Sequence, residues 1–178
     1  MTTQIPDPSL IPAAAAPWLG TPFHVRAQIQ GVGVDCIHLV AAIYIQAGVG
    51  ATFAPPHYTL DGGQHLQRSL IREYVCQTRL FVCLPPMVTV QTGDLVEFNF
   101  GRVGHHCGVM VNAVEFIHAP SYPPKKVCLS PLSDPTFSRR VCAVYRPKIW
   151  ATAVPGIPLQ PSPSWPCAGC PKRSAIDS

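Results

Sequence analysis

The sequence predicts an α+β domain, with helices in the first half of the chain and an antiparallel sheet in the second. Apolar residues recur at helical spacing over residues 36–47 and again over residues 64–76. From residue 88 onward the apolar pattern changes to a period of two, which is typical of strands. Helices followed by a meander of strands indicate an α+β class rather than an alternating α/β one.

Length and composition predict one domain between two proline-rich ends. The chain has 178 residues, enough for a single domain with a real core. Its net charge of +4 is too small to indicate a nucleic-acid partner. Proline removes a backbone donor and disfavours helix in the residue before it. We therefore predict an extended arm over residues 1–17, a domain over residues 18–148 and a flexible tail over residues 149–178.

The first predicted helix runs from residue 36 to residue 47. Asp35 can cap its start and Gly48 can end it. The segment is apolar nearly all round, which predicts a central position. No formal charge occurs between Asp35 and Asp61, but polar residues and glycines interrupt the run. This interruption favours a buried helix and a loop over a membrane span.

The second predicted helix covers residues 64–76, and the strands follow it. Alternation predicts strands over residues 94–100, 106–111, 116–119 and 141–146. Residues 101–104 form the expected turn between the first two of these strands.

Eight cysteines raise the question of a disulfide scaffold or a metal site. Residues 1–17 contain no Lys or Arg and do not resemble a removable targeting segment, so we expect synthesis in the cytoplasm and reduced thiols. Only Cys167 and Cys170 have C-x-x-C spacing, and no second pair accompanies them. We interpret this pair as incidental, and we predict neither a metal site nor a cofactor.

Cys36 is the candidate nucleophile because it lies in the first turn of an apolar helix. Unpaired N–H groups and the helix dipole at that place favour thiolate over thiol. A free cysteine is also commonly a small core residue, so a structural role for Cys36 stays open on this segment alone.

Two histidines in neighbouring predicted strands complete the candidate site. His106 and His118 are expected on the same side of a hairpin, where one can take the thiol proton and the other can orient it. His105 should point to the opposite face and is the rival base. Cys107 should likewise face away from Cys36 and lie in the core.

These motifs, in this order, resemble NlpC-type cell-wall cysteine peptidases, which are circularly rearranged relatives of papain. The resemblance is narrower still to the phage and gene-transfer-agent tail peptidases. It covers residues 18–147 and rests on five pieces: Trp18-x-Gly20-Thr21-Pro22, Gly33-x-Asp35-Cys36-x-x-Leu39-Val40, Gly93-Asp94, His106-x-Gly108-Val109 and Phe116-Ile117-His118-Ala119. It implies a papain-like fold in which the nucleophile begins a helix that packs on an antiparallel sheet.

The resemblance also implies roles and a substrate. Cys36 would attack an amide carbonyl, His106 would act as base and His118 would orient His106. Backbone N–H groups at the helix start would receive the oxyanion, with Asp35 nearby. The implied substrate is the stem peptide of peptidoglycan, cut between D-glutamate and the diamino acid. The implied setting is a virion or tail particle, with tail or baseplate proteins as partners.

Two departures from the family pattern keep other functions open. Phe23 stands where the family commonly has Tyr, which removes a hydroxyl from the site. His38 stands where the family favours Gly, so an imidazole narrows the cleft or adds a polar contact. The alternatives are an amidase or acyltransferase of the same fold, and a tail or scaffold component that has lost turnover.

Overall fold

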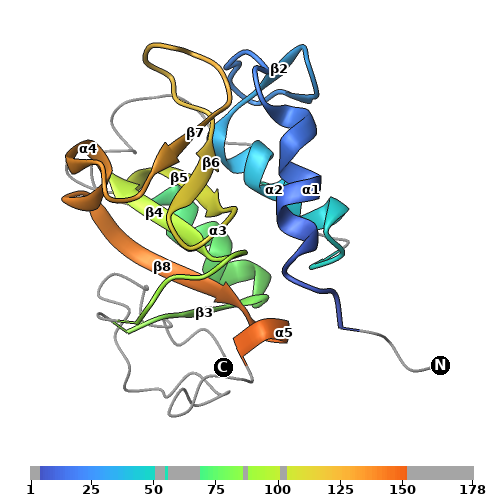
Figure 1. The fold of residues 1–178 in the computed structure, drawn as a ribbon, viewed down its shortest axis with the longest axis vertical. Helices are drawn as coiled ribbons and strands as arrows, with labels where there is room; N and C mark the ends of the chain where they lie inside the picture. The colour runs from blue at the N-terminus through green and yellow to red at the C-terminus, as the bar shows by residue number, and fades with distance from the viewer. Residues whose placement is uncertain (1–4, 51–54, 56–68, 86–87, 101–103, 152–178) are drawn as a thin grey trace, which may run out of the picture.

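The computed structural model describes residues 5–50, 55, 69–85, 88–100 and 104–151 (Figure 1). The helices are α1 (Leu10–Ala15), the 3-10 helix η1 (Ala16–Trp18), α2 (Cys36–Gln46), α3 (Leu70–Thr78), α4 (Pro135–Ser138) and α5 (Lys148–Ala151). The strands are β1 (Gln28–Ile29), β2 (Gly33–Val34), β3 (Phe81–Cys83), β4 (Leu95–Asn99), β5 (Gly104–Met110), β6 (Glu115–His118), β7 (Cys128–Pro131) and β8 (Val141–Pro147).

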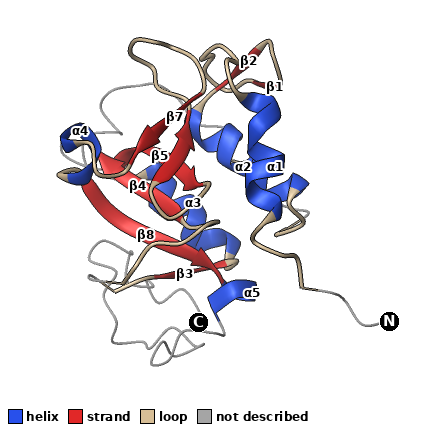
Figure 2. Cartoon of the chain, in the orientation of Figure 1, coloured by secondary structure: helices blue, strands red, loops and turns tan. Residues whose placement is uncertain are grey.

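An antiparallel sheet with the strand order β3-β8-β4-β5-β6-β7 forms the centre of the domain. Helices α1, α2 and α3 cover one face of this sheet, and the short helix α4 lies on the other (Figure 2). Helices on one side of an antiparallel sheet define an α+β fold, so the predicted fold class is confirmed.

Each face of the sheet has its own apolar cluster. On the helix side, α2 contributes side chains that are fully buried, as its apolar sequence predicts. On the other side, Phe98, Phe116 and Phe137 pack in tilted and edge-to-face contacts, with ring centroids 4.9 to 5.4 Å apart. The two clusters hold the sheet rigid between them, and His106 and His118 lie at the edge of the aromatic one.

Local caps fix where the two long helices begin. The Asp35 carboxylate accepts the His38 amide at 2.9 Å, so α2 starts at Cys36 as predicted. The Ser69 hydroxyl accepts the Arg72 amide at 3.1 Å and starts α3. The predicted start of this helix at residue 64 lies outside the described residues. Among the helices that are described, none is long and apolar enough to cross a membrane.

The extended arm predicted for the N-terminus is wrong for residues 10–15, which form α1. Pro12 lies in the first turn, where its missing N–H has no intrahelical partner to lose. Ile11 is fully buried in the main core, so packing overrides the local proline signal. The Trp150 indole of α5 donates to the Pro6 carbonyl at 2.6 Å and ties the two ends of the domain together. The predicted tail, with Cys167 and Cys170, lies beyond the described residues except for its first three positions.

All four predicted strands are present, within about two residues of the expected bounds. The edge strands β3 and β7 and the short pair β1 and β2 were not predicted. Strand β7 alternates between half-buried and exposed residues and ends at a proline, so its apolar pattern is weak. Pairing with β6, rather than a propensity of its own, makes this segment a strand.

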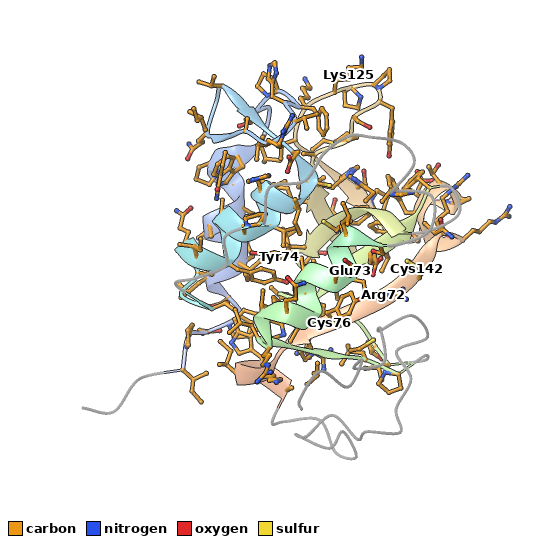
Figure 3. The ribbon with its side chains drawn as sticks, turned by 180° about the vertical axis from the view of Figure 1, so that it is seen from behind. Arg72, Glu73, Tyr74, Cys76, Lys125 and Cys142 are labelled. Atoms are coloured by element: carbon orange, nitrogen blue, oxygen red, sulfur yellow. The ribbon has the colours of Figure 1, made fainter. Side chains whose placement is uncertain are left out.

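Buried charges join the sheet to its surroundings. The Asp94 carboxylate accepts two hydrogen bonds from the Arg146 guanidinium, both at 2.8 Å. The carboxylate of the fully buried Glu97 accepts a hydrogen bond from the Tyr145 hydroxyl at 2.7 Å. Figure 3 shows Arg72 of α3 beside Cys142 of β8. Arg72 Nε lies 3.6 Å from a Glu97 carboxylate oxygen, and the Cys142 thiol donates to the Glu97 backbone carbonyl at 3.4 Å. The predicted Gly93-Asp94 motif therefore serves the fold, since it anchors β4 to β8.

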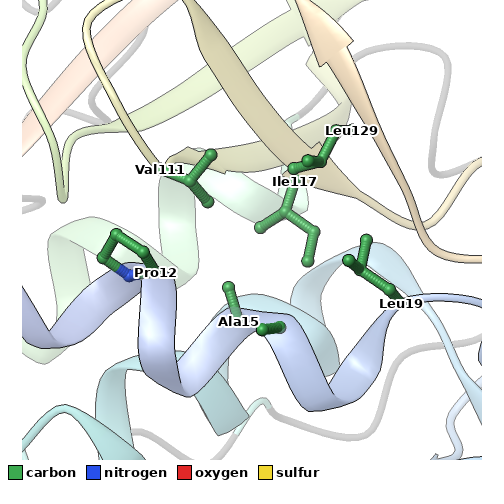
Figure 4. Close-up of a pocket in the computed structure, with 7 residues that line it drawn as sticks. Pro12, Ala15, Leu19, Val111, Ile117 and Leu129 are labelled. Carbon is green, nitrogen blue, oxygen red and sulfur yellow. The ribbon is translucent and has the colours of Figure 1, made fainter.

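A small apolar recess lies between α1 and the end of the sheet (Figure 4). It is lined by Pro12, Ala15, Ala16, Leu19, Val111, Ile117 and Leu129. Its lining is entirely apolar and includes none of the predicted site residues, so it is separate from the thiol described below.

Candidate active site

The candidate nucleophile is the first residue of α2. Strand β2 leads directly into Asp35, whose buried carboxylate accepts the Arg26 amide at 2.6 Å in addition to the His38 amide. These hydrogen bonds fix the backbone just before Cys36 and orient the first turn of α2. Cys36 is partly exposed, whereas the residues on either side of it are buried. The thiol is therefore positioned rigidly, at a residue that keeps partial contact with solvent.

His106 and His118 face each other from neighbouring strands, as predicted. His106 Nε2 and His118 Nδ1 are 2.8 Å apart, and both side chains are buried. Gly108 lies opposite His118 in the β5–β6 pairing. A Cβ at Gly108 would lie 2.6 Å from the Ile117 carbonyl oxygen and 3.2 Å from the His118 Cβ. The glycine of the His-x-Gly motif therefore allows the close approach that joins the two imidazoles.

The environment of Cys36 favours its thiolate. A hydrogen bond from the Cys107 side chain, followed by the hydrogen bond and positive charge of His106, outweighs burial and lowers the pKa of Cys36 to about 5. Because His118 occupies Nε2 of His106, the other ring nitrogen, Nδ1, is left to face the thiol. Cys36 and His106 therefore form a cysteine–histidine pair, in which the thiol is more acidic than usual.

The orientation predicted for Cys107 is wrong. Its side chain lies in the main core, as expected, but Cys36 packs against this same core, so Cys107 does not face away from it. The reason is that α2 packs on the sheet face to which Cys107 points, so the thiol at the helix start contacts this face. Burial, and then the bond to Cys36, raises the pKa of Cys107 well above its usual range.

His118 is neutral and is held from its far side by β7. Burial, and then the charge of His106, lowers the pKa of His118 to about 3. His118 Nε2 lies 2.9 Å from the Ser130 hydroxyl oxygen and 3.4 Å from the Cys128 sulfur. When His106 is protonated, it donates to His118 Nδ1, so His118 carries its proton on Nε2 and donates to Ser130. Ser130 thus provides an acceptor for the tautomer of His118 that accepts from His106.

Sequence reasoning missed Ser130 and the orientation of Cys107. No motif marks Ser130, because it lies in a strand whose apolar pattern is weak. Cys107 could have been placed by asking on which face of the sheet the predicted central helix packs. Alternation alone does not answer that question.

The remaining predicted residues surround this group. His38 Nδ1 lies 2.7 Å from an Asp35 carboxylate oxygen, so Asp35 holds both the helix start and this imidazole. Phe23 packs on the core and pairs in a parallel bridge with Val34, the residue directly before Asp35. The rival base His105 is half-buried on the neighbouring position of β5. Among the described residues, no cluster of histidine, cysteine or acidic side chains could hold a metal ion.

Comparison with solved structures identifies the fold. An NlpC/P60 family protein from Bacillus cereus superposes with a TM-score of 0.54, at 21% identity over 79% of this chain and 40% of that chain. NlpC1 from Trichomonas vaginalis gives a TM-score of 0.55, at 17% identity over 82% and 46% of the two chains. The peptidoglycan hydrolase RipB from Mycobacterium tuberculosis gives 0.50, at 18% identity over 78% and 63%.

The chain therefore has the α+β, papain-like fold of NlpC/P60 proteins, and the predicted NlpC-type fold is confirmed. It spans 40% of the length of the B. cereus protein and 46% of that of the T. vaginalis protein. No protein-family profile matches the sequence. No curated protein matches it either.

Proposed function

We propose that this protein is a cysteine peptidase that hydrolyses amide bonds in the stem peptides of bacterial peptidoglycan. The observation that carries the proposal is the lowered pKa of the Cys36 thiol at the start of α2, beside His106. His106 is itself held by the neutral His118. A structural cysteine needs no such pair. The peptidoglycan substrate is supported by the fold, which RipB shares.

The proposed reaction has two stages. The Cys36 thiolate attacks the amide carbonyl, and N–H groups at the start of α2 stabilise the oxyanion. His106 donates its proton to the leaving amine, which leaves an acyl-enzyme. His106 then takes a proton from water, which attacks the thioester and releases the acid. His118 keeps the His106 ring oriented throughout, and Ser130 keeps His118 in the accepting tautomer.

The finer proposal is cleavage between D-glutamate and the diamino acid, by a protein carried in a virion or tail particle. It rests on the motifs that the sequence shares with phage and gene-transfer-agent tail peptidases. Proteomic mass spectrometry of purified tail particles tests the setting. Peptides of this chain in washed particles support it, and their absence from particles whose other proteins are all detected contradicts it.

Mass spectrometry of muropeptides tests the reaction. Purified peptidoglycan of several stem chemistries is incubated with the wild-type chain and with Cys36→Ala. New fragments made only by the wild type support the proposal, and their masses identify the bond. If reduced, folded wild-type protein releases no fragment from any wall type, the proposal is wrong and a scaffold role is favoured.

The adjacent histidines provide a matched pair for the same assay. We expect His106→Ala to abolish fragment release, because the thiolate loses both its counter-ion and the acid for the leaving amine. His105→Ala should keep the wild-type fragment pattern. The opposite result would make His105 the base.

A further inference from the structure

Three exposed cations lie on the two segments that lead to and from the candidate site. Arg26 belongs to the segment that precedes α2, and Lys125 and Lys126 belong to the loop between β6 and β7. Figure 3 shows Lys125 at the top of the molecule. We call Arg26, Lys125 and Lys126 the basic surface.

Backbone pairing holds these two segments side by side. The Phe23 amide donates to the Lys125 carbonyl at 2.8 Å, and Pro22 pairs with Lys126 in an antiparallel bridge. The cations therefore share one end of the molecule, although about 100 residues separate them in the sequence.

Each segment of the basic surface is also attached to a residue of the candidate site. The Arg26 amide donates to the Asp35 carboxylate at 2.6 Å, and Asp35 directly precedes Cys36. The loop that carries the two lysines follows directly after His118, the last residue of β6. A ligand on the basic surface therefore lies beside the site rather than on a remote face.

No acidic residue of these segments offsets the three charges. Residues 8–34 and 116–133 contain neither Asp nor Glu. Within the described ranges of the chain, no ion pair includes Arg26, Lys125 or Lys126. All three charges are thus free to attract an anion from solvent.

The backbone holds two of these cations in a conformation that favours glycine. Arg26 has a φ of 60° and Lys125 a φ of 52°, both in the left-handed region, where a side chain costs free energy. The Lys125 amide also donates to the Tyr122 carbonyl at 2.8 Å, which closes a turn. Positions of this kind persist where the surrounding structure determines them, and they are frequent at ligand-binding sites.

We propose that the basic surface binds a polymer of closely spaced anions, phosphates or carboxylates, that accompanies peptidoglycan in the cell wall. This inference rests on the proposed function, which places the substrate in the wall. One exposed ion pair contributes little free energy, so three exposed cations act together only on a ligand that carries several anions. A polymer is therefore favoured over a single carboxylate.

The position of the basic surface favours a wall polymer over a nucleic acid or a membrane. A polymer bound there holds the chain to the wall and raises the local concentration of stem peptides beside Cys36. Neither a nucleic acid nor a membrane would bring an amide substrate to the candidate nucleophile.

Co-sedimentation with purified sacculi tests the proposal. The Cys36→Ala chain is used so that the wall stays intact during the measurement. Sacculi that retain their phosphodiester polymers are compared with the same sacculi after hydrofluoric acid, which removes these polymers and leaves the carboxylates of peptidoglycan. We expect tighter binding to the untreated sacculi, and loss of binding between about 0.05 M and about 0.5 M NaCl. Equal, salt-sensitive binding to both would assign the anions to carboxylates.

Two double variants separate the basic surface from net charge. We expect Lys125→Gln/Lys126→Gln to lower the affinity for untreated sacculi about tenfold at low salt, because glutamine keeps the length of the side chain without its charge. Arg79→Gln/Arg139→Gln is the matched control. It removes the same charge from exposed positions at the ends of α3 and α4, and it should keep the affinity within about twofold.

The proposal is overturned if the two double variants bind alike, or if binding does not change with salt. It is also overturned if vesicles of phosphatidylglycerol and phosphatidylcholine, or duplex DNA, bind the Cys36→Ala chain more tightly than sacculi do. The muropeptide assay on the wild type keeps the two proposals distinguishable. Lysine-dependent binding by a chain that releases no fragments supports the basic surface and contradicts only the peptidase function.

Discussion

The charge state of Cys36 is the property of a single residue that is most open to measurement. At pH 6 a thiol with a pKa of about 5 is about 90% ionised, against about 0.3% for an ordinary thiol of pKa about 8.5. A thiolate of lower pKa is also a weaker nucleophile, which lowers the expected ratio of the two reaction rates by about 40-fold. We therefore expect iodoacetamide to label Cys36 about tenfold faster than the exposed Cys76 at pH 6.

This advantage should depend on the neighbours that lower the pKa of Cys36. His106→Ala removes the positive charge and a hydrogen bond, so the pKa of Cys36 should rise and labelling at pH 6 should fall towards the rate of Cys76. Peptide mass spectrometry after timed quenching measures both rates. Equal rates at Cys36 and Cys76 in the wild type would contradict the thiolate.

Ser130 is a positioning residue, because it acts on His118 and through it on His106. One hydrogen bond contributes about 0.5–1.5 kcal/mol, so Ser130→Ala should lower kcat about 2- to 10-fold and leave KM unchanged. If Ser130 had only a structural role, Ser130→Ala would lower the stability of the protein without lowering kcat at an unchanged KM. Ser133→Ala, at an exposed turn position, is the control and should keep the wild-type kcat.

Within the sheet, the Asp94–Arg146 pair joins β4 to β8. Both side chains are buried, so removal of one partner leaves the other charge without compensation. Asp94→Ala should lower the free energy of unfolding by about 3–5 kcal/mol, measured by urea denaturation. Asp134→Ala, which removes only the cap of α4, should cost about 1 kcal/mol. Equal losses would contradict the role of the buried pair.

The contrast between α2 and β7 shows which elements could be predicted. Helix α2 has its cap, its apolar faces and its terminal glycine within the 14 residues from Asp35 to Gly48, so local signals define it. The same holds for the alternation of β4 and for the contact between the His106 and His118 side chains across one hairpin. Strand β7 exists because β6 offers a partner, and α1 exists because Ile11 fills the core. Such tertiary causes leave no local pattern, which is why Ser130 and the orientation of Cys107 were missed.

At the scale of the whole molecule, the N-terminal segment belongs to the core rather than to an arm. Ile11→Ala should lower the free energy of unfolding by about 2–5 kcal/mol, because Ile11 is fully buried. Leu10→Ala, at the neighbouring and largely exposed position, should change it by about 0.5 kcal/mol or less. If both variants unfold at the wild-type urea concentration, α1 does not stabilise the domain.

The parts of the candidate site are distant in sequence and meet only across the completed sheet. Cys36 begins α2, His106 and His118 lie on β5 and β6, and Ser130 lies on β7. In an unfolded chain Cys36 would have an ordinary thiol pKa and little reactivity in mild acid. The labelling rate of this one cysteine at pH 6 therefore reports the population of folded molecules. A nascent or misfolded chain carries no activated nucleophile that could react with the cell producing it.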